Sequence, residues 1–181
     1  FITAKEMKHA GSPYGFITMG SAMAFTKNCD MKAGGIPRKK ATEDFYFLQE
    51  VVKTSSVFTI PKVLVYPSAR PSDRVYLGTG FRMMQAKNGE NLTDLYYNKK
   101  AFQILKNWLI LGQKGFNSPL EKMLIDAIKI HPNLPQFLKE NRIIKIWDGL
   151  NSSCKNEEKF KHQFHCWFDG LKTHRLLKYF S

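Results

Sequence analysis

Cysteine is scarce in this sequence, with three residues among 181. Cys29, Cys154 and Cys166 form no even-numbered disulfide framework, so we expect free thiols in a reducing compartment. Long apolar runs are also missing. Residues 108–111 make the longest candidate, whereas a membrane-spanning helix needs about 18 to 20 apolar residues. The sequence therefore predicts neither a disulfide-stapled secreted domain nor a membrane-spanning helix.

Acidic residues are few, with 15 against 28 lysines and arginines, and the net charge is +13. The excess is spread along the chain, because residues 1–90 carry 13 basic and 7 acidic residues and residues 91–181 carry 15 and 8. Such a balance suits a polyanion, a nucleotide diphosphate or an anionic membrane surface, and equally a merely soluble basic surface. No nucleic-acid-binding motif gathers the lysines, so we do not expect nucleic acid as a partner.

The chain changes character near residue 90, which predicts two parts. Before that point, short runs rich in β-branched and aromatic residues alternate with glycine and proline. The runs that read as strands are residues 16–19, 22–25, 57–60 and 62–66. Two short helices are expected among them. One covers residues 26–33, capped by Thr26 and stopped by Gly34-Gly35, and the other runs from a Thr42 cap to Lys53.

After residue 90 helical periodicity dominates. Residues 91–111 predict a helix whose apolar face includes Leu95, Phe102, Leu105 and Leu109. The run 118–121, Ser-Pro-Leu-Glu, is a helix start signal, and that helix is expected to end near Ile130. Further helices are expected over residues 135–150 and, as a pair broken near Gly170, over residues 156–180. These helices predict a small helical lobe.

Glu43 and Asp44 stand in the first turn of the helix expected from Thr42 to Lys53. A glycosyl transfer with inversion needs one carboxylate to take the proton from the acceptor hydroxyl. It also needs the leaving diphosphate stabilised, usually by a metal held on other carboxylates. An aspartate at a helix start, behind a glycine-rich and basic loop, can supply the first of these. The same pair can equally do no more than complement the helix dipole.

Three motifs occur in order around this pair: residues 20–25 (Gly-Ser-Ala-Met-Ala-Phe), residues 32–36 (Lys-Ala-Gly-Gly-Ile) and residues 42–48 (Thr-Glu-Asp-Phe-Tyr-Phe-Leu). The ordered set resembles family 2 glycosyltransferases of the GT-A fold over about residues 16–66. The resemblance implies that Asp44 is the general base, with Glu43 beside it at the acceptor site. It further implies that Gly34 and Gly35 let the backbone pass close to substrate, and that Gly20 and Ser21 line the floor of the sugar site.

A loop with two arginines follows. Residues 66–74, with Arg70 and Arg74 four apart, are similar to a segment of bacterial glycosyltransferase-like proteins that continues into a Gly-Thr-Gly like residues 78–80. The two arginines can clamp a diphosphate or a charged acceptor through paired donors, or simply anchor an ordinary loop. The basic triplet of residues 38–40, just ahead of the Glu-Asp pair, can screen a phosphate or form a solvated turn.

The chain also departs from this family. No Asp-x-Asp occurs, the βαβ half that should precede the Gly-Ser strand is missing, and the first residue is Phe1. We therefore expect a C-terminal, acceptor-side portion of a longer enzyme, inactive by itself, whose divalent metal (Mn or Mg) is held by ligands outside this chain. A degenerate transferase kept as a scaffold is a further interpretation.

Two other groups of residues favour a structural role. His162, His165 and Cys166 lie close together, but their spacing fits no common zinc pattern and aromatic residues interleave them, so we expect ordinary helix surface. Trp108, Trp147 and Trp167 lie on apolar helical faces, which predicts core packing.

The sequence thus predicts an α+β protein, with a partial GT-A-like α/β segment of few strands over residues 1–90 and a helical lobe over residues 91–181. Its expected partners are a nucleotide-sugar donor and a saccharide or lipid-linked acceptor. The expected location is the cytoplasm, with peripheral contact at the anionic inner face of the membrane left open. The alternative is a non-catalytic basic helical module that binds nucleic acid or a protein partner.

Overall fold

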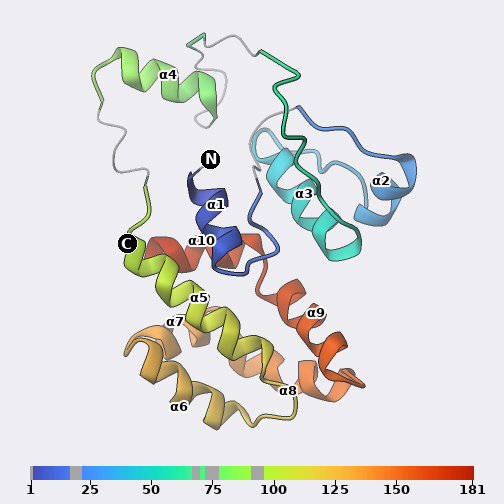
Figure 1. Cartoon of the computed structure of the whole chain (residues 1–181), viewed down its shortest axis with the longest axis vertical. Helices are drawn as coiled ribbons and strands as arrows, with labels where there is room; N and C mark the ends of the chain where they lie inside the picture. Colours follow the sequence, from blue (N-terminus) through green and yellow to red (C-terminus); the bar gives the residue numbers. More distant parts are fainter. Residues whose placement is uncertain (1, 17–21, 67–69, 72–77, 91–95) are drawn as a thin grey trace. The chain divides into compact units, whose positions relative to one another are not determined.

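The computed structural model describes residues 2–16, 22–66, 70–71, 78–90 and 96–181. Over these residues the chain is all-α, with ten helices and no strand (Figure 1). In chain order they are α1 (Ile2–His9), α2 (Lys27–Ala33), α3 (Glu43–Thr54), α4 (Thr79–Lys87), α5 (Lys99–Gln113), α6 (Leu120–Ile130), α7 (Leu134–Glu140), α8 (Ile143–Ser153), α9 (Glu157–Trp167) and α10 (Gly170–Tyr179).

The α+β class predicted from the sequence, with its GT-A-like α/β segment, is therefore wrong. The predicted strands at residues 22–25, 57–60 and 62–66 form no strand, and of residues 16–19 only residue 16 lies in the described part. The physical reason is that a strand becomes stable only when a neighbouring strand pairs its backbone N–H and C=O groups. β-branched residues favour strands, but whether a strand forms depends on the surrounding structure. No described segment supplies the neighbouring strand.

The chain divides into two compact units. Unit 1 comprises Phe1–Gly15 and Tyr97–Ser181, and unit 2 comprises Phe16–Tyr96. The helices α1 and α5 to α10 belong to unit 1, and α2, α3 and α4 belong to unit 2. The boundary predicted at residue 90 stays a prediction.

Unit 1 is organised around the indole of Trp108 on α5. The Phe164 and Phe168 rings meet it edge-on, at centroid distances of 5.7 and 5.8 Å, which is the geometry aromatic pairs prefer. The predicted core role of the three tryptophans is confirmed, because Trp108 and Trp147 are 0% exposed and Trp167 is 7% exposed. On the predicted apolar face of α5, Phe102, Leu105 and Leu109 are buried, while Leu95 lies outside the described residues.

The helix ends of unit 1 follow local signals in part. The predicted break near Gly170 is confirmed, since Asp169 caps α10 by accepting a hydrogen bond from the Lys172 N–H at 3.0 Å. The single helix predicted over residues 135–150 is wrong, because Arg142, with φ of 70°, separates α7 from α8. Ser118 does not cap α6, which begins at Leu120 without a side-chain cap.

Unit 2 holds the helix pair that carries the predicted site residues. The predicted α2 is confirmed, with the Thr26 hydroxyl accepting a hydrogen bond from the Cys29 N–H at 3.2 Å. The first turn of α3 also lies where it was predicted, although Thr42 has a φ of 68° and makes no side-chain cap. The Phe47 ring on α3 is 1% exposed and lies 4.7 Å from the ring of Phe25, which is 42% exposed, so this aromatic contact lies at the edge of the small core of the unit.

Candidate functional site

The start of α3 presents the two predicted carboxylates. Glu43 and Asp44 are both half-buried. One oxygen of Asp44, Oδ1, accepts a hydrogen bond from the Phe45 N–H at 2.7 Å. Successive residues of an α-helix are about 100° apart around its axis.

The Gly34-Gly35 turn ends α2 and begins the loop toward these carboxylates. Both residues are left-handed, with φ of 80° and 78°, and the Gly35 N–H donates to the Asp30 carbonyl at 2.9 Å. Glycine is the residue that adopts this conformation at least cost. A Cβ added at either position would meet nothing within 4 Å. The backbone conformation therefore requires glycine here, and the turn is open enough for another molecule to approach.

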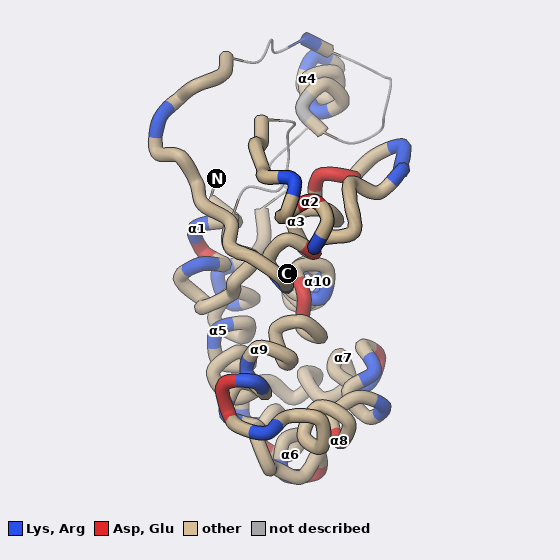
Figure 2. The backbone as a smooth tube through the Cα atoms, turned by 90° about the vertical axis from the view of Figure 1, so that its right-hand side faces the viewer, with Lys and Arg blue, Asp and Glu red and all other residues tan. Residues whose placement is uncertain are grey.

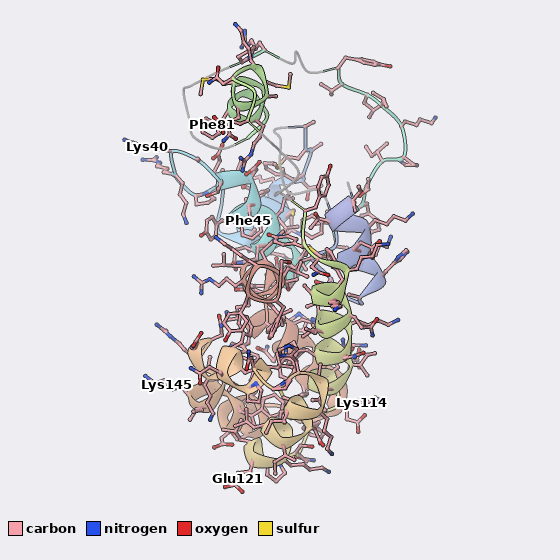
Figure 3. The ribbon with its side chains drawn as sticks, turned by 90° about the vertical axis from the view of Figure 1, so that its left-hand side faces the viewer. Lys40, Phe45, Phe81, Lys114, Glu121 and Lys145 are labelled. Atoms are coloured by element: carbon pink, nitrogen blue, oxygen red, sulfur yellow. The ribbon has the colours of Figure 1, made fainter. Side chains whose placement is uncertain are left out.

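The basic triplet of residues 38–40 lies in the same loop. The Lys39 ammonium lies 3.3 Å from the centroid of the Tyr46 ring, a cation–π contact that holds the loop against α3. Arg38 and Lys40 are exposed and have no hydrogen bond or ion pair with described residues. Figure 3 shows Lys40 projecting outward from this loop. Two cations are thus left for an anionic ligand near the start of α3.

The remaining predicted site residues are not brought to this turn by the described structure. Gly20, Ser21 and Arg74 lie outside the described residues. Arg70 is exposed, and no hydrogen bond or ion pair among the described residues joins it to Glu43 or Asp44. The predicted clamp of Arg70 and Arg74 stays a prediction.

The described residues do not fit a divalent metal. Nowhere among them do three or more His, Cys, Asp or Glu side chains gather as a metal would require, and Mn²⁺ or Mg²⁺ takes several oxygen ligands. On α9, His162 and Cys166 lie 3.7 Å apart (Nδ1 to Sγ). A pair of two ligands is not a structural zinc site.

His165 differs from the surface residue predicted from the sequence. Burial, followed by the charges of Lys161 and His162, lowers its pKa from 6.5 to about 4. Its Nδ1 is buried and has no hydrogen-bond partner among the described residues, and its backbone carbonyl accepts a 2.8 Å hydrogen bond from the Tyr14 hydroxyl. His165 is therefore a half-buried residue of unit 1 whose surroundings disfavour the protonated imidazole.

Sequence reasoning missed an open surface pocket of about 500 Å³ in unit 1, at α7 and α10. It is lined by Phe137, Glu140, Asn141, Arg175, Lys178 and Tyr179. Arg175 and Lys178 are three apart on one helix and so share a face, which the sequence does indicate. Nothing in the sequence indicates that this face meets the end of α7.

Comparisons with known proteins give no relative: no family model, no curated protein and no solved structure matches the chain. Among the described residues, no helix combines the length and apolar character needed to cross a membrane.

Proposed function

We propose that residues 20–44 form the acceptor side of an inverting nucleotide-sugar glycosyltransferase site, with Asp44 as the general base. The observation that carries the proposal is the carboxylate of Asp44 in the first turn of α3. It follows an open left-handed glycine turn and two cations that have no partner among the described residues. The order of the Gly-Ser, Gly-Gly and Glu-Asp motifs supports it.

The proposed chemistry assigns one step to this chain. The Asp44 carboxylate takes the proton from the acceptor hydroxyl while that oxygen attacks the anomeric carbon from the face opposite the nucleotide. The bond from the anomeric carbon to the diphosphate oxygen breaks, and the nucleotide diphosphate leaves with the electron pair. Inversion follows because the attack and the departure occur on opposite faces.

Glu43 and the basic triplet have supporting roles in the proposal. Glu43 adds negative charge beside Asp44 in the first turn of α3. Arg38 and Lys40 attract an anionic acceptor, such as one carrying a phosphate, into the loop before α3. Arg70 and Arg74 are assigned to anion contacts on the resemblance alone.

The donor side of the reaction is not assigned to described residues. Because these residues do not fit a divalent metal, no step is routed through one, and the ligands of the expected Mn or Mg would come from elsewhere. The proposed substrates remain a nucleotide sugar and a saccharide or lipid-linked acceptor, in the cytoplasm.

The test is a transfer assay on the polypeptide as the cell makes it, so that any segment supplying the donor side is present. Radiolabelled nucleotide sugars are offered with Mn²⁺ or Mg²⁺, and both transfer and donor hydrolysis are measured. Replacing Asp44 by Asn should lower kcat by about 10²- to 10⁴-fold. Glu50→Gln is the matched control, because Glu50 lies on the same helix, pairs with Lys53 at 2.7 Å and should leave the rate unchanged.

Two results overturn the proposal. A wild-type rate in Asp44→Asn removes Asp44 from the mechanism. Failure to transfer or hydrolyse any donor removes the transferase and favours the alternative, a non-catalytic basic module. The binding surface of that module would lie on unit 1, where 17 basic and 8 acidic residues give a net charge of +9. Figure 2 shows the lysines and arginines of unit 1 spread over several helices, whereas nucleic-acid binding requires them on one face.

A further inference from the structure

Residues 57–66, which we call the apolar segment, expose hydrophobic side chains to an unusual degree. Of the 17 large hydrophobic side chains exposed in the described residues, six fall in these ten positions. Phe58 and Tyr66 are each 87% exposed, and Ile60, Val63, Leu64 and Val65 are 56 to 70% exposed. Single exposed hydrophobics are normal, but a contiguous group marks an interaction site.

The backbone of the apolar segment belongs to no helix or strand and bends at residues 61–62. No backbone hydrogen bond joins it to another described segment. Residues 63–66 are four consecutive apolar residues, and all four side chains are exposed. A covering partner must therefore accept a run of neighbouring apolar side chains, and a lipid interface does so without a matching pocket.

Within residues 51–72, all the charged side chains are basic. No aspartate or glutamate occurs from residue 51 to residue 72, while Lys53, Lys62 and Arg70 do. Lys53 pairs with Glu50, and Lys62 and Arg70 are exposed with no partner among the described residues. The segment thus combines aliphatic and aromatic side chains with cations, the combination that binds the boundary between lipid headgroups and acyl chains. Tyrosine is enriched at that depth.

We propose that the apolar segment inserts into the interface of an anionic membrane. Val63, Leu64 and Val65 enter the acyl boundary, the rings of Phe58 and Tyr66 lie at headgroup level, and Lys62 and Arg70 contact anionic headgroups. The backbone N–H and C=O groups stay at a depth where water still reaches them, so interfacial insertion does not leave them unsatisfied. This inference stands without the transferase; if both hold, the membrane is where a lipid-linked acceptor would be met.

The experiment is co-sedimentation of the chain with vesicles of phosphatidylcholine alone and with vesicles containing about 30% phosphatidylserine, at low and high salt. Binding should favour the anionic vesicles and weaken as salt rises. Each of Lys62→Ser and Arg70→Ser should weaken it about fivefold. The double variant Leu64→Ser/Val65→Ser should weaken it tenfold or more, at about 0.8 kcal/mol for each CH₂ removed from the interface. Ile125→Ser is the matched control, since Ile125 is 58% exposed on α6 of unit 1 and should not matter.

A second measurement locates the contact. Tyr66→Trp places an indole at the segment, and its fluorescence should be quenched by brominated lipid while the buried native tryptophans are not. None of these side chains packs in a core, so circular dichroism should stay at the wild-type level. Equal binding to both vesicles, equal loss in Ile125→Ser, an unquenched indole in Tyr66→Trp, or self-association that hides the segment would each overturn the proposal. These experiments do not measure transferase activity, so their results can be interpreted even if the transferase proposal is wrong.

Discussion

Two helical glycines should respond in opposite ways to the same substitution. Gly112 lies in α5 and Gly149 in α8. Alanine favours a helix over glycine by about 0.5 to 1 kcal/mol, so propensity alone predicts that both Gly→Ala variants are more stable. A Cβ at Gly149 would meet nothing within 4 Å, and we expect Gly149→Ala to gain that amount.

At Gly112 packing opposes propensity. A Cβ there would clash with Cζ and Cε2 of the Phe164 ring. The Phe164 ring is 0% exposed and lies parallel to that of Phe168 at 6.1 Å, so it has no free direction in which to move. Overpacking a core costs about 1 to 3 kcal/mol, and two such short contacts place this variant at the upper end. Subtracting the helix gain, we expect Gly112→Ala to lose about 2 kcal/mol.

The assay is equilibrium unfolding in urea, followed by tryptophan fluorescence. All three tryptophans lie in unit 1, so the signal reports the unit that carries both glycines. The midpoint should fall for Gly112→Ala and rise for Gly149→Ala without a change of slope. In a Phe164→Leu background the cost of Gly112→Ala should largely disappear, because the ring is gone. A Gly112→Ala variant as stable as wild type would refute the packing of α5 against α9.

Two further predictions concern pH and capping. The pKa of His165 is lowered to about 4 in the folded chain and is about 6.5 when unfolded, so its stabilising contribution is complete above pH 6.5 and is lost as pH falls toward 4. Urea unfolding at intervals from pH 7.5 to pH 4 should show the wild type losing up to about 3 kcal/mol relative to His165→Gln; parallel curves would contradict the half-buried neutral imidazole. Asn156→Ala should cost about 1 kcal/mol, because Asn156 caps α9 by accepting from the Lys159 N–H at 2.9 Å. Asn133→Ala should cost nothing measurable, since Asn133 precedes α7 without a side-chain cap, and equal effects in thermal melts would show that the Asn156 cap contributes nothing.

Local signals in the sequence predicted local structure well. Thr26 and Gly34 fix the two ends of α2 through hydrogen bonds within a few residues, and both ends were predicted correctly. The split between α7 and α8 was missed because Arg142 adopts a left-handed conformation that glycine or asparagine would have indicated. The burial of His165 was missed because it depends on packing against helices that are far away in the sequence, which local patterns do not indicate.

At the candidate site too, local features were predicted and long-range ones were not. The positions of Glu43 and Asp44 in a first turn, and the glycine turn before them, are set by neighbours in sequence and were predicted. Whether Arg70 reaches them depends on a long connection in which no helix or strand is described. The distance between residues joined by such a connection cannot be predicted from a sequence pattern. The family resemblance led to predicted strands that the described residues do not form. Those strands would need neighbouring strands to pair with, and the described residues provide none.

The failure of the strand prediction and the exposure of the apolar segment have one physical origin. Residues 63–66 are four consecutive apolar residues, as in strands covered on both sides of a sheet. Exposing such a run to water is unfavourable, which favours a partner that covers it. A sheet edge would satisfy its backbone as well as its side chains. A lipid interface covers the side chains and also contacts the cations Lys62 and Arg70, for which a sheet edge gives no role. The vesicle experiment distinguishes the sheet edge from the lipid interface, because only the lipid interface predicts that binding depends on Lys62 and Arg70.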